Sequence, residues 1–421
     1  MRRLIRAVFG VALCALAHPA EAQAVRQDQA VFVEKRDAFR EQLEQRAEEK
    51  RSEKKKPERE LKMDFTGLAL PRSPEEFQQA WHYPPISQGL TGSCWAFSSL
   101  SFFESEIHRL TGSKIKLSEM YLTYWEYVEK ARRFVRERGN SAFGRGSQPN
   151  ATIRLWKQYG ALPAETYGAP TSAEDFHDDR QMFAKMKTYL EAVKEQNAWN
   201  EEEVLATIRS ILDHYLGAPP PSVTVDGKAM TPQEYLTQVV ALDLDDYVDI
   251  LSLAQEPYYE RVEYPVWDNW WHSKDYYNVP LEDFTAIIKT AVREGYTLCI
   301  VGDNSEPGFY PPLDVAMIPS FDLPSPFIDD DARQLRFSNE STTDDHAIHL
   351  VGYLEKDGQD WYLIKDSDSK ARNGRHEGYM FYHEDYVKLK MMNFLVHRDI
   401  VEKVLKDYRE SERSEQRLQS R

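Results

Sequence analysis

Four side chains in this sequence are of the types that break an acyl bond. Acyl transfer by a cysteine needs a thiolate, a proton acceptor, a group that orients the acceptor, and donors for the oxyanion. Cys94 begins an apolar stretch with helical periodicity over 94–110, and a helix N-terminus favours a thiolate. Gln88 lies six residues earlier in a glycine-containing loop. Its amide is therefore placed to join the backbone N–H of Cys94 as an oxyanion donor.

A predicted β-hairpin supplies the acceptor and its partner. Two strand-like runs, 347–354 and 361–365, stand on either side of an Asp-Gly turn signal. Residues paired across that turn have numbers that add up to about 715, and those of His346 and Asp366 add up to 712. Both residues therefore lie at one end of the hairpin. Strand alternation assigns His349 to the other face, so we choose His346 as the base.

The composition is that of a globular protein. The chain has 421 residues, of which 41% are hydrophobic, and this is enough for one large core or two packed lobes. A formal net charge of -16, without an evident basic face, argues against nucleic acid as a partner. We expect no cofactor and no metal.

The first 22 residues have the pattern of a secretory signal peptide. Arginines precede an apolar run over 7–17, and Ala20-Glu21-Ala22 fits a small-x-small cleavage site. The apolar run is well short of the ~20 residues of a membrane-spanning helix. We therefore expect an exported protein, periplasmic or extracellular, with no membrane span in the mature form. Its remaining cysteines, Cys94 and Cys299, allow at most one disulfide.

Composition divides the rest of the chain into three parts. Residues 23–62 are charged and read as an exposed helix or disordered linker, with a prosegment as the alternative. Residues 63–400 form the predicted catalytic domain, in which about 172–283 is a mainly helical insertion. Residues 401–421 form a charged helical tail.

Periodicity predicts the elements that position the site. Further helices are expected over 121–134, 150–159, 182–193, 201–215 and 283–293, and a buried strand over 296–301. Cys299 lies inside that strand, where a buried, inert thiol is expected.

Two other clusters admit a functional and a structural interpretation. The aromatic patch of Trp267, Trp270, Trp271, Tyr276 and Tyr277 either lines a substrate cleft or packs inside the insertion. The acidic clusters 329–331 and 344–345 show no recurring ligand spacing, so we expect solvated carboxylates rather than a cation site.

Several segments resemble those of papain-like cysteine peptidases. The segment QGLTGSCWAF over 88–97 resembles the family's nucleophile segment. The family's order continues with LSE at 117–119, YGALP at 159–163, DHA at 345–347, IKDS at 364–367 and GY at 378–379. The resemblance spans roughly residues 63–400.

Two features are similar to the bleomycin hydrolase and aminopeptidase C branch. Thr91 stands where secreted papain-type enzymes have a disulfide cysteine, and His346 follows Cys94 by 252 residues, against ~130–150 in simple papain-like enzymes. The resemblance implies an α+β, two-lobe fold, with a helical lobe carrying Cys94 and an antiparallel β lobe carrying His346 and Asp366. Members of that branch form ring-like hexamers, so a homo-oligomer is compatible with the resemblance.

The function that the resemblance implies is hydrolysis of bonds in a peptide or protein substrate through a Cys94 thioester, and aminopeptidase action is one form of it. Asp366 replaces the family's asparagine and adds a charge that favours imidazolium. Asp368 replaces a shielding tryptophan, which predicts a wetter pair. Two alternatives stay open, namely a catalytically silent peptide-binding or scaffold protein and a transglutaminase-like acyl transferase.

Overall fold

The computed structural model describes residues 46, 61–168, 176–406 and 408. The chain divides into two compact units, 1–59 and 60–421, and all but one of the described residues belong to the second. The predicted signal peptide, nearly all of the segment 23–62 and most of the tail 401–421 lie outside the described residues. In the described part, no helix combines the length and the apolar character that a membrane span requires.

The helices follow the periodicity of the sequence closely. The nucleophile helix α2 (Cys94–Thr111) ends at Gly112, whose φ of 74° is the left-handed conformation that suits a glycine C-cap. Ser118 caps the next helix by accepting a hydrogen bond from the backbone N–H of Tyr121. The remaining α-helices are α3 (Glu119–Arg136), α4 (Ala151–Tyr159), α5 (Arg180–Glu195), α6 (Glu201–Leu216), α7 (Pro232–Tyr235), α8 (Leu281–Arg293), α9 (Asp330–Ser338), α10 (Glu384–Lys390) and α11 (Arg398–Val404).

One large, mainly antiparallel sheet organises the second unit. Its strands follow the order β5-β6-β4-β13-β7-β10-β11-β12-β9-β8, and β1 also pairs with β10. The bounds are β1 (Gln78–Gln79), β4 (Tyr247–Leu251), β5 (Arg261–Val262), β6 (Tyr276–Asn278), β7 (Leu298–Gly302), β8 (Phe309–Tyr310), β9 (Val315–Ala316), β10 (His346–Lys356), β11 (Gln359–Lys365), β12 (Tyr379–His383) and β13 (Met391–His397). A separate hairpin joins β2 (Val223–Val225) and β3 (Lys228–Met230).

The predicted hairpin and its register are confirmed, with one refinement. The turn residues Asp357 and Gly358 have φ of 54° and 77°, as a two-residue hairpin turn requires. Leu354 pairs with Trp361, as predicted. An irregularity between Leu350 and Gly352 then moves the register by one residue. This bulge shifts the end of β11 along β10, in the direction that brings Asp366 toward His346.

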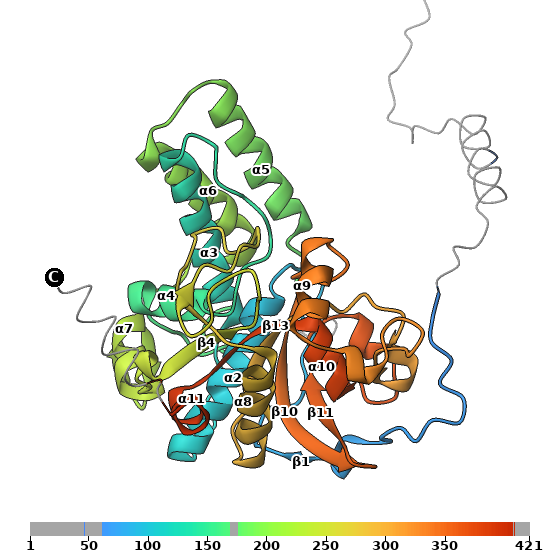
Figure 1. The fold of residues 1–421 in the computed structure, drawn as a ribbon. Coiled ribbons are helices and arrows are strands. Elements are labelled where there is room, and N and C mark those ends of the chain that lie inside the picture. Colours follow the sequence, from blue (N-terminus) through green and yellow to red (C-terminus); the bar gives the residue numbers. More distant parts are fainter. Residues whose placement is uncertain (1–45, 47–60, 169–175, 407, 409–421) are drawn as a thin grey trace, which may run out of the picture. The chain divides into compact units, whose positions relative to one another are not determined.

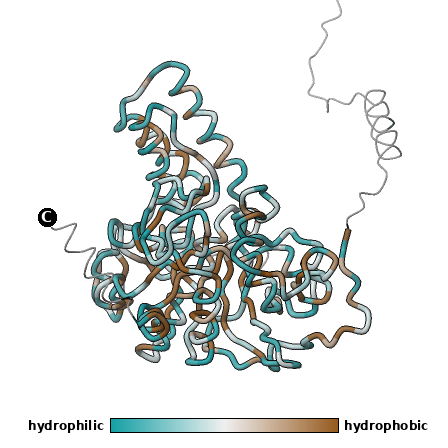
Figure 2. Tube along the Cα trace, viewed as in Figure 1, coloured by the Kyte–Doolittle hydropathy of each residue, from teal (hydrophilic) through white to brown (hydrophobic). Residues whose placement is uncertain are grey.

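The apolar core is divided between a helical side and a sheet side. One buried cluster joins α2, α3, α4, α5 and α6, whereas another joins the sheet to α8, α10 and α11. In the view of Figure 1, α3, α5 and α6 are grouped above α2, and α8 runs beside β10. In Figure 2 the hydrophobic segments gather around the central strands. The predicted α+β fold with a helical and a β lobe is confirmed.

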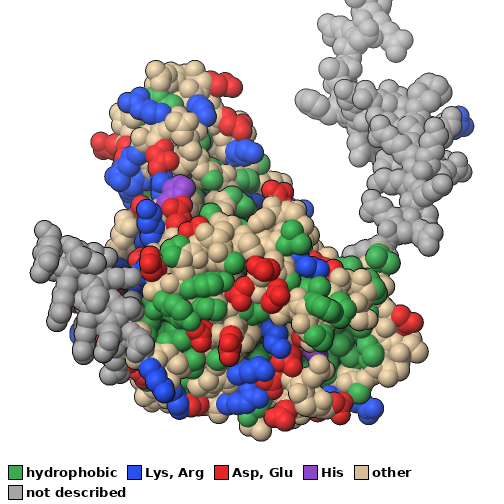
Figure 3. All heavy atoms as spheres, in the orientation of Figure 1, with side chains coloured by type: hydrophobic (Ala, Val, Ile, Leu, Met, Phe, Trp, Pro, Cys, Tyr) green, Lys and Arg blue, Asp and Glu red, His purple; other side chains and the backbone are tan. Residues whose placement is uncertain are grey.

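The segment 172–283 has two structural parts. Its first part contains α5, α6, the β2–β3 hairpin and α7, which form the helical portion. Its second part contributes β4, β5 and β6 to the central sheet, where β13 pairs with β4. The face of the unit in Figure 3 carries acidic and basic side chains intermixed around hydrophobic ones.

Candidate active site

Cys94 is the first residue of α2 and a partly buried free thiol. Ala96 and Phe97 donate their backbone N–H groups to the carbonyl of Ser93, so the first turn forms directly at the cysteine. The first N–H groups of a helix have no intrahelical acceptor. The sulfur therefore lies at the end of α2 where the helix dipole favours negative charge. The helix packs against β10, which carries the histidine.

His346 and Asp366 form a buried pair at one end of the hairpin. His346 is the first residue of β10, and its Nε2 lies 2.8 Å from Oδ1 of Asp366, the residue that follows β11. Cys94 is a further hydrogen-bond partner of the imidazole ring, which leaves Nδ1 for the sulfur. Burial acts to lower the pKa of His346, but the charge and hydrogen bond of Asp366, together with Cys94, raise this pKa well above its ordinary value. The arrangement favours a charged imidazolium beside the Cys94 sulfur.

The predicted wetter environment of this pair is wrong. His346 is 7% exposed and Asp366 is 2% exposed, although Asp368 stands at the tryptophan position of the family pattern. The backbone N–H of Asp368 donates to Asp366 Oδ1 at 2.8 Å. Asp368 therefore contributes a backbone donor that fixes the acceptor carboxylate, and shielding of the pair does not depend on its side chain.

Gln88 is held beside the pair by the residue that follows Asp366. Ser367 donates its hydroxyl to Gln88 Oε1 at 2.7 Å, and its carbonyl accepts the backbone N–H of Gln88 at 2.9 Å. Gln88 Nε2 donates to the carbonyl of Thr91 at 2.9 Å, and its second N–H remains for an incoming oxyanion. Ser367 was not among the predicted site residues. Its place directly after the predicted partner of the histidine is the sequence signal that would have found it.

The loop between Gln88 and Cys94 is closed by hydroxyl groups. Thr91 donates to the carbonyl of Gln88 at 2.8 Å and shares a 2.5 Å contact with the hydroxyl of Ser93. Gly89 has a φ of 66°, and a Cβ there would lie 2.3 Å from the carbonyl oxygen of His177. These contacts fix the loop without the disulfide that a cysteine at position 91 would provide.

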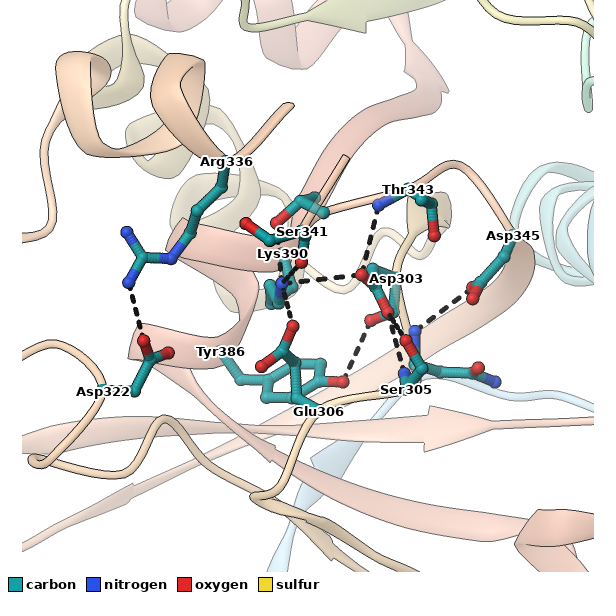
Figure 4. A network of polar contacts seen from close by, with 12 residues as sticks. Asp303, Ser305, Glu306, Asp322, Arg336, Ser341, Thr343, Asp345, Tyr386 and Lys390 are labelled. Atoms are coloured by element: carbon teal, nitrogen blue, oxygen red, sulfur yellow. Dashed lines mark hydrogen bonds and ion pairs between the residues drawn. The ribbon is translucent and has the colours of Figure 1, made fainter. Parts of the chain in front are cut away.

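A buried network holds the chain that leads into His346 (Figure 4). Lys390, at the end of α10, is fully buried, and its ammonium group donates to the carbonyl of Ser341 at 2.6 Å and to Thr342 Oγ1 at 2.7 Å. It also forms ion pairs with Glu306 and, at 3.5 Å, with Asp303. Asp303 accepts the backbone N–H of Thr343 at 3.1 Å. The segment 341–345 is thus tied to the loop after β7.

His349 occupies a polar cluster two turns along α2 from Cys94. Its Nδ1 lies 2.7 Å from Ser101 Oγ, and the ammonium of Lys365 donates to the same hydroxyl at 2.7 Å. Burial and then the charge of Lys365 hold the pKa of His349 well below its ordinary value. Burial lowers the pKa of Lys365 to about 8. The structure thus places His346, and not His349, against Cys94.

The other sequence predictions have mixed outcomes. Cys299 is buried inside β7 as predicted, and burial raises its thiol pKa. Of the aromatic patch, only Trp267 lines the cavity beside Cys94, whereas Trp270 is buried in packing contacts. The prediction of a solvated pair at 344–345 is wrong for Asp344, because Gln148 donates to its carboxylate in a shielded contact.

A cleft opens beside the nucleophile. It has a volume of about 660 Å³, and its walls come from three separate regions of the chain around Gly146, Trp267 and Asp344. Cys94 and His346 both line it. A peptide in this cleft therefore has direct access to the sulfur and the imidazole.

Comparison with known proteins places this geometry in a family. Residues 73–419 match the Peptidase C1-like family. Aminopeptidase C of Lactococcus lactis subsp. cremoris is 22% identical in an alignment of length 363 that covers 76% of this chain and 81% of the relative. Aminopeptidase C of Lactobacillus delbrueckii subsp. lactis is 25% identical in an alignment of length 263 that covers 53% of this chain and 59% of the relative.

A solved structure shows the same fold. The crystal structure of PepW from Lactobacillus rhamnosis HN001 has a TM-score of 0.62 and 17% sequence identity, covering 80% of this chain and 84% of PepW. The family match includes the nucleophile helix, the hairpin and the sheet between them. The resemblance to the aminopeptidase C branch is confirmed, and the chain belongs to the Peptidase C1-like family as a papain-like cysteine peptidase.

Proposed function

We propose that the protein is exported and hydrolyses peptide bonds through a thioester on Cys94. The observation that carries the proposed chemistry is the buried His346–Asp366 pair with Cys94 beside its imidazole, and with Gln88 anchored next to it through Ser367. The series contains a nucleophile, a proton carrier, a group that orients the carrier and an oxyanion donor.

In the first half of the reaction the Cys94 thiolate attacks the carbonyl carbon of the scissile bond. The carbonyl oxygen becomes an oxyanion, which accepts hydrogen bonds from the Gln88 amide and the backbone N–H of Cys94. The carbon–nitrogen bond then breaks while the imidazolium of His346 gives its proton to the leaving amine. The products are a free amine and an acyl thioester on Cys94.

In the second half a water molecule hydrolyses the thioester. His346, now neutral, takes a proton from the water as its oxygen attacks the thioester carbon. The second oxyanion uses the same donors, and its collapse releases the carboxylic acid and the Cys94 thiolate. Asp366 keeps the ring oriented through both halves and stabilises its charged form.

The finer proposal is removal of residues from a free peptide N-terminus. Its support is that the curated relatives named above are aminopeptidases. Fluorogenic amides of a single amino acid, with a free or an acetylated α-amino group, test this proposal. We expect faster release from the free form, and equal or faster release from the acetylated form would contradict it.

Alkylation by an epoxide that traps papain-type thiolates tests the nucleophile. We expect one adduct, on Cys94, with loss of turnover, because Cys299 is buried and its thiol pKa is raised. Cys299→Ala is the matched control and keeps the adduct, whereas Cys94→Ala loses it. His346→Ala removes the proton carrier, and we expect a loss of turnover of about 100-fold or more. Failure of Cys94 to react in the folded, reduced protein would overturn the proposed function and favour a catalytically silent relative.

A further inference from the structure

The cleft beside Cys94 is lined by carboxyl groups and contains no lysine or arginine among the described residues of its walls. Its four acidic side chains are Glu340, Asp344, Asp345 and Asp268, and its titratable base is His346. Such a wall attracts positive charge and repels negative charge. Basic and acidic side chains are intermixed on the face shown in Figure 3, whereas the described residues of this cleft wall include no lysine or arginine.

Asp268 and Asp344 form a shielded carboxyl pair within this wall. They are hydrogen-bonded to each other, and Gln148 donates to both, at 2.7 Å in the case of Asp268 Oδ1. Burial raises the pKa of both carboxyls, and the charge of Asp268 raises that of Asp344 further. Asp344 Oδ1 is shielded from solvent and accepts no hydrogen bond from any described residue. An orphaned oxygen of this kind is uncommon for a buried carboxyl group.

The nearest buried cation is not free to fill that place. Lys130 is 1% exposed, and its ammonium group donates to the carbonyls of Gly144, at 2.9 Å, and Gly146. It stabilises the loop that forms one wall of the cleft. Among the described residues, the Gln148 amide is therefore the side chain that donates to this carboxyl pair. The two acids also share a proton with each other.

An aromatic side chain lines the same cleft next to Asp268. Trp267 is 57% exposed although it lines the cleft. A Cβ at Gly144 would lie 2.2 Å from its ring, so only glycine at 144 lets the indole occupy this position. An exposed indole face beside carboxylates is a favourable site for an ammonium or guanidinium group.

We propose that this cleft selects peptides that bring a cation to the wall formed by Trp267 and the carboxyl groups while the scissile carbonyl lies at Cys94. The cation is an ammonium or guanidinium group, and it comes from either the N-terminus or a basic side chain of the substrate. The inference rests on the proposed function, because it assigns a substrate class to the same site.

Four fluorogenic amides test the proposal and separate the two sources of the cation. They carry arginine or its neutral isostere citrulline, each with a free or an acetylated α-amino group. We expect kcat/KM to be at least tenfold higher for the cationic member of a matched pair. A preference for the free over the acetylated form, with arginine and with citrulline alike, identifies the N-terminus as the source of the cation. A preference for acetyl-arginine over acetyl-citrulline identifies the side chain. Equal values for all four substrates would overturn the proposal.

Asp344→Asn tests which residues carry the selection. We expect the cationic-to-neutral ratio of kcat/KM to fall at least fivefold in this variant, and also in Glu340→Gln to a smaller extent. Asp357→Asn is the matched control, because it makes the same substitution in the exposed hairpin turn, where asparagine tolerates the φ of 54°. An unchanged ratio in both Asp344→Asn and Glu340→Gln would contradict the assignment.

Failure of this inference is distinguishable from failure of the proposed function. Alkylation of Cys94 by a neutral epoxide reports the nucleophile alone. A reactive Cys94 with no preference for cationic substrates would contradict this inference but not the proposed peptidase activity. An unreactive Cys94 sinks the proposed function itself.

Discussion

At the scale of single residues, the charge on Asp366 distinguishes this site from one with an asparagine. Asp366 Oδ1 accepts from His346 and from the backbone of Asp368, whereas Oδ2 is buried and accepts no hydrogen bond within the described part of the chain. Its negative charge therefore acts mainly on the imidazole, whose pKa it raises. The sequence predicted this pairing, but the burial of the pair depended on packing that the local sequence does not reveal.

Asp366→Asn is expected to move the alkaline limb of the pH profile. The imidazolium form of His346 is present below its pKa and is lost as the pH rises through it. Removing the charge that raises this pKa moves the alkaline limb of kcat/KM to lower pH. Turnover near neutral pH stays measurable, because the asparagine oxygen still accepts the ring N–H. The measurement is kcat/KM between about pH 4 and pH 10.

The neighbouring charge provides the control for this variant. Asp368→Asn removes a negative charge two residues away, but this side chain does not contact the imidazole. We expect its alkaline limb to stay within a few tenths of a unit. An alkaline limb that stays in place or moves to higher pH in Asp366→Asn would contradict the role assigned to Asp366.

At the scale of elements, the hairpin and the loops around it position the base. The bulge in β10 brings Asp366 to His346, and the Lys390 network holds the segment that enters β10. The hairpin was predictable because a turn signal and two apolar runs are local features. The network was not, since Lys390, Glu306 and Thr343 come from separate elements and meet only in the folded chain (Figure 4).

Lys390→Met is expected to destabilise the fold strongly. The substitution leaves the buried carboxylate of Asp303 without its cation, and breaking a buried ion pair in this way costs about 3–5 kcal/mol. The measurement is the free energy of unfolding in urea. Lys388→Met makes the same change on the same helix, but the Lys388 side chain is 26% exposed, and we expect a loss of about 1 kcal/mol or less. Equal losses in the two variants would show that the network contributes little.

His349→Ala is expected to separate stability from catalysis. The substitution removes the partner of Ser101 Oγ in the buried cluster with Lys365, and we expect a loss of about 1–3 kcal/mol in unfolding free energy. Turnover per active site, titrated by the epoxide, should remain within about twofold of that of the unsubstituted protein. A folded variant that binds the epoxide at Cys94 but does not turn over would show that His349 takes part in the chemistry.

At the scale of the whole molecule, the sequence predicted where helices and strands occur better than it predicted which of them lie side by side. The helices from α2 to α6 and the strands of the hairpin appear where periodicity indicated them. That β7 lies between β10 and β13 was not predictable, because strand pairing over long sequence separations leaves no local pattern. The same reason explains why Asp268 was not predicted as a cleft residue, although its neighbour Trp267 was. The sequence does not show that Asp268 lies next to Asp344 in the folded chain.

Export predicts a shortened mature chain. Cleavage after Ala22, at the small-x-small site, would give a protein that begins at Gln23 and lacks Cys14. N-terminal sequencing and intact mass of the protein from the producing cell's periplasm or medium measure this. A chain that retains Met1 and stays with the cytoplasmic fraction would contradict the export proposal.

The separation of Cys94 from His346 has a consequence for the cell that makes the enzyme. The two residues are 252 positions apart, so the ribosome exposes the thiol long before the imidazole and Asp366 are synthesised. Until the hairpin docks against α2, the chain has a cysteine but no peptidase. The order of synthesis therefore gives the producing cell a period of latency that needs no inhibitor. Under the proposed export, a chain that crosses the membrane unfolded acquires its activity only after it has crossed.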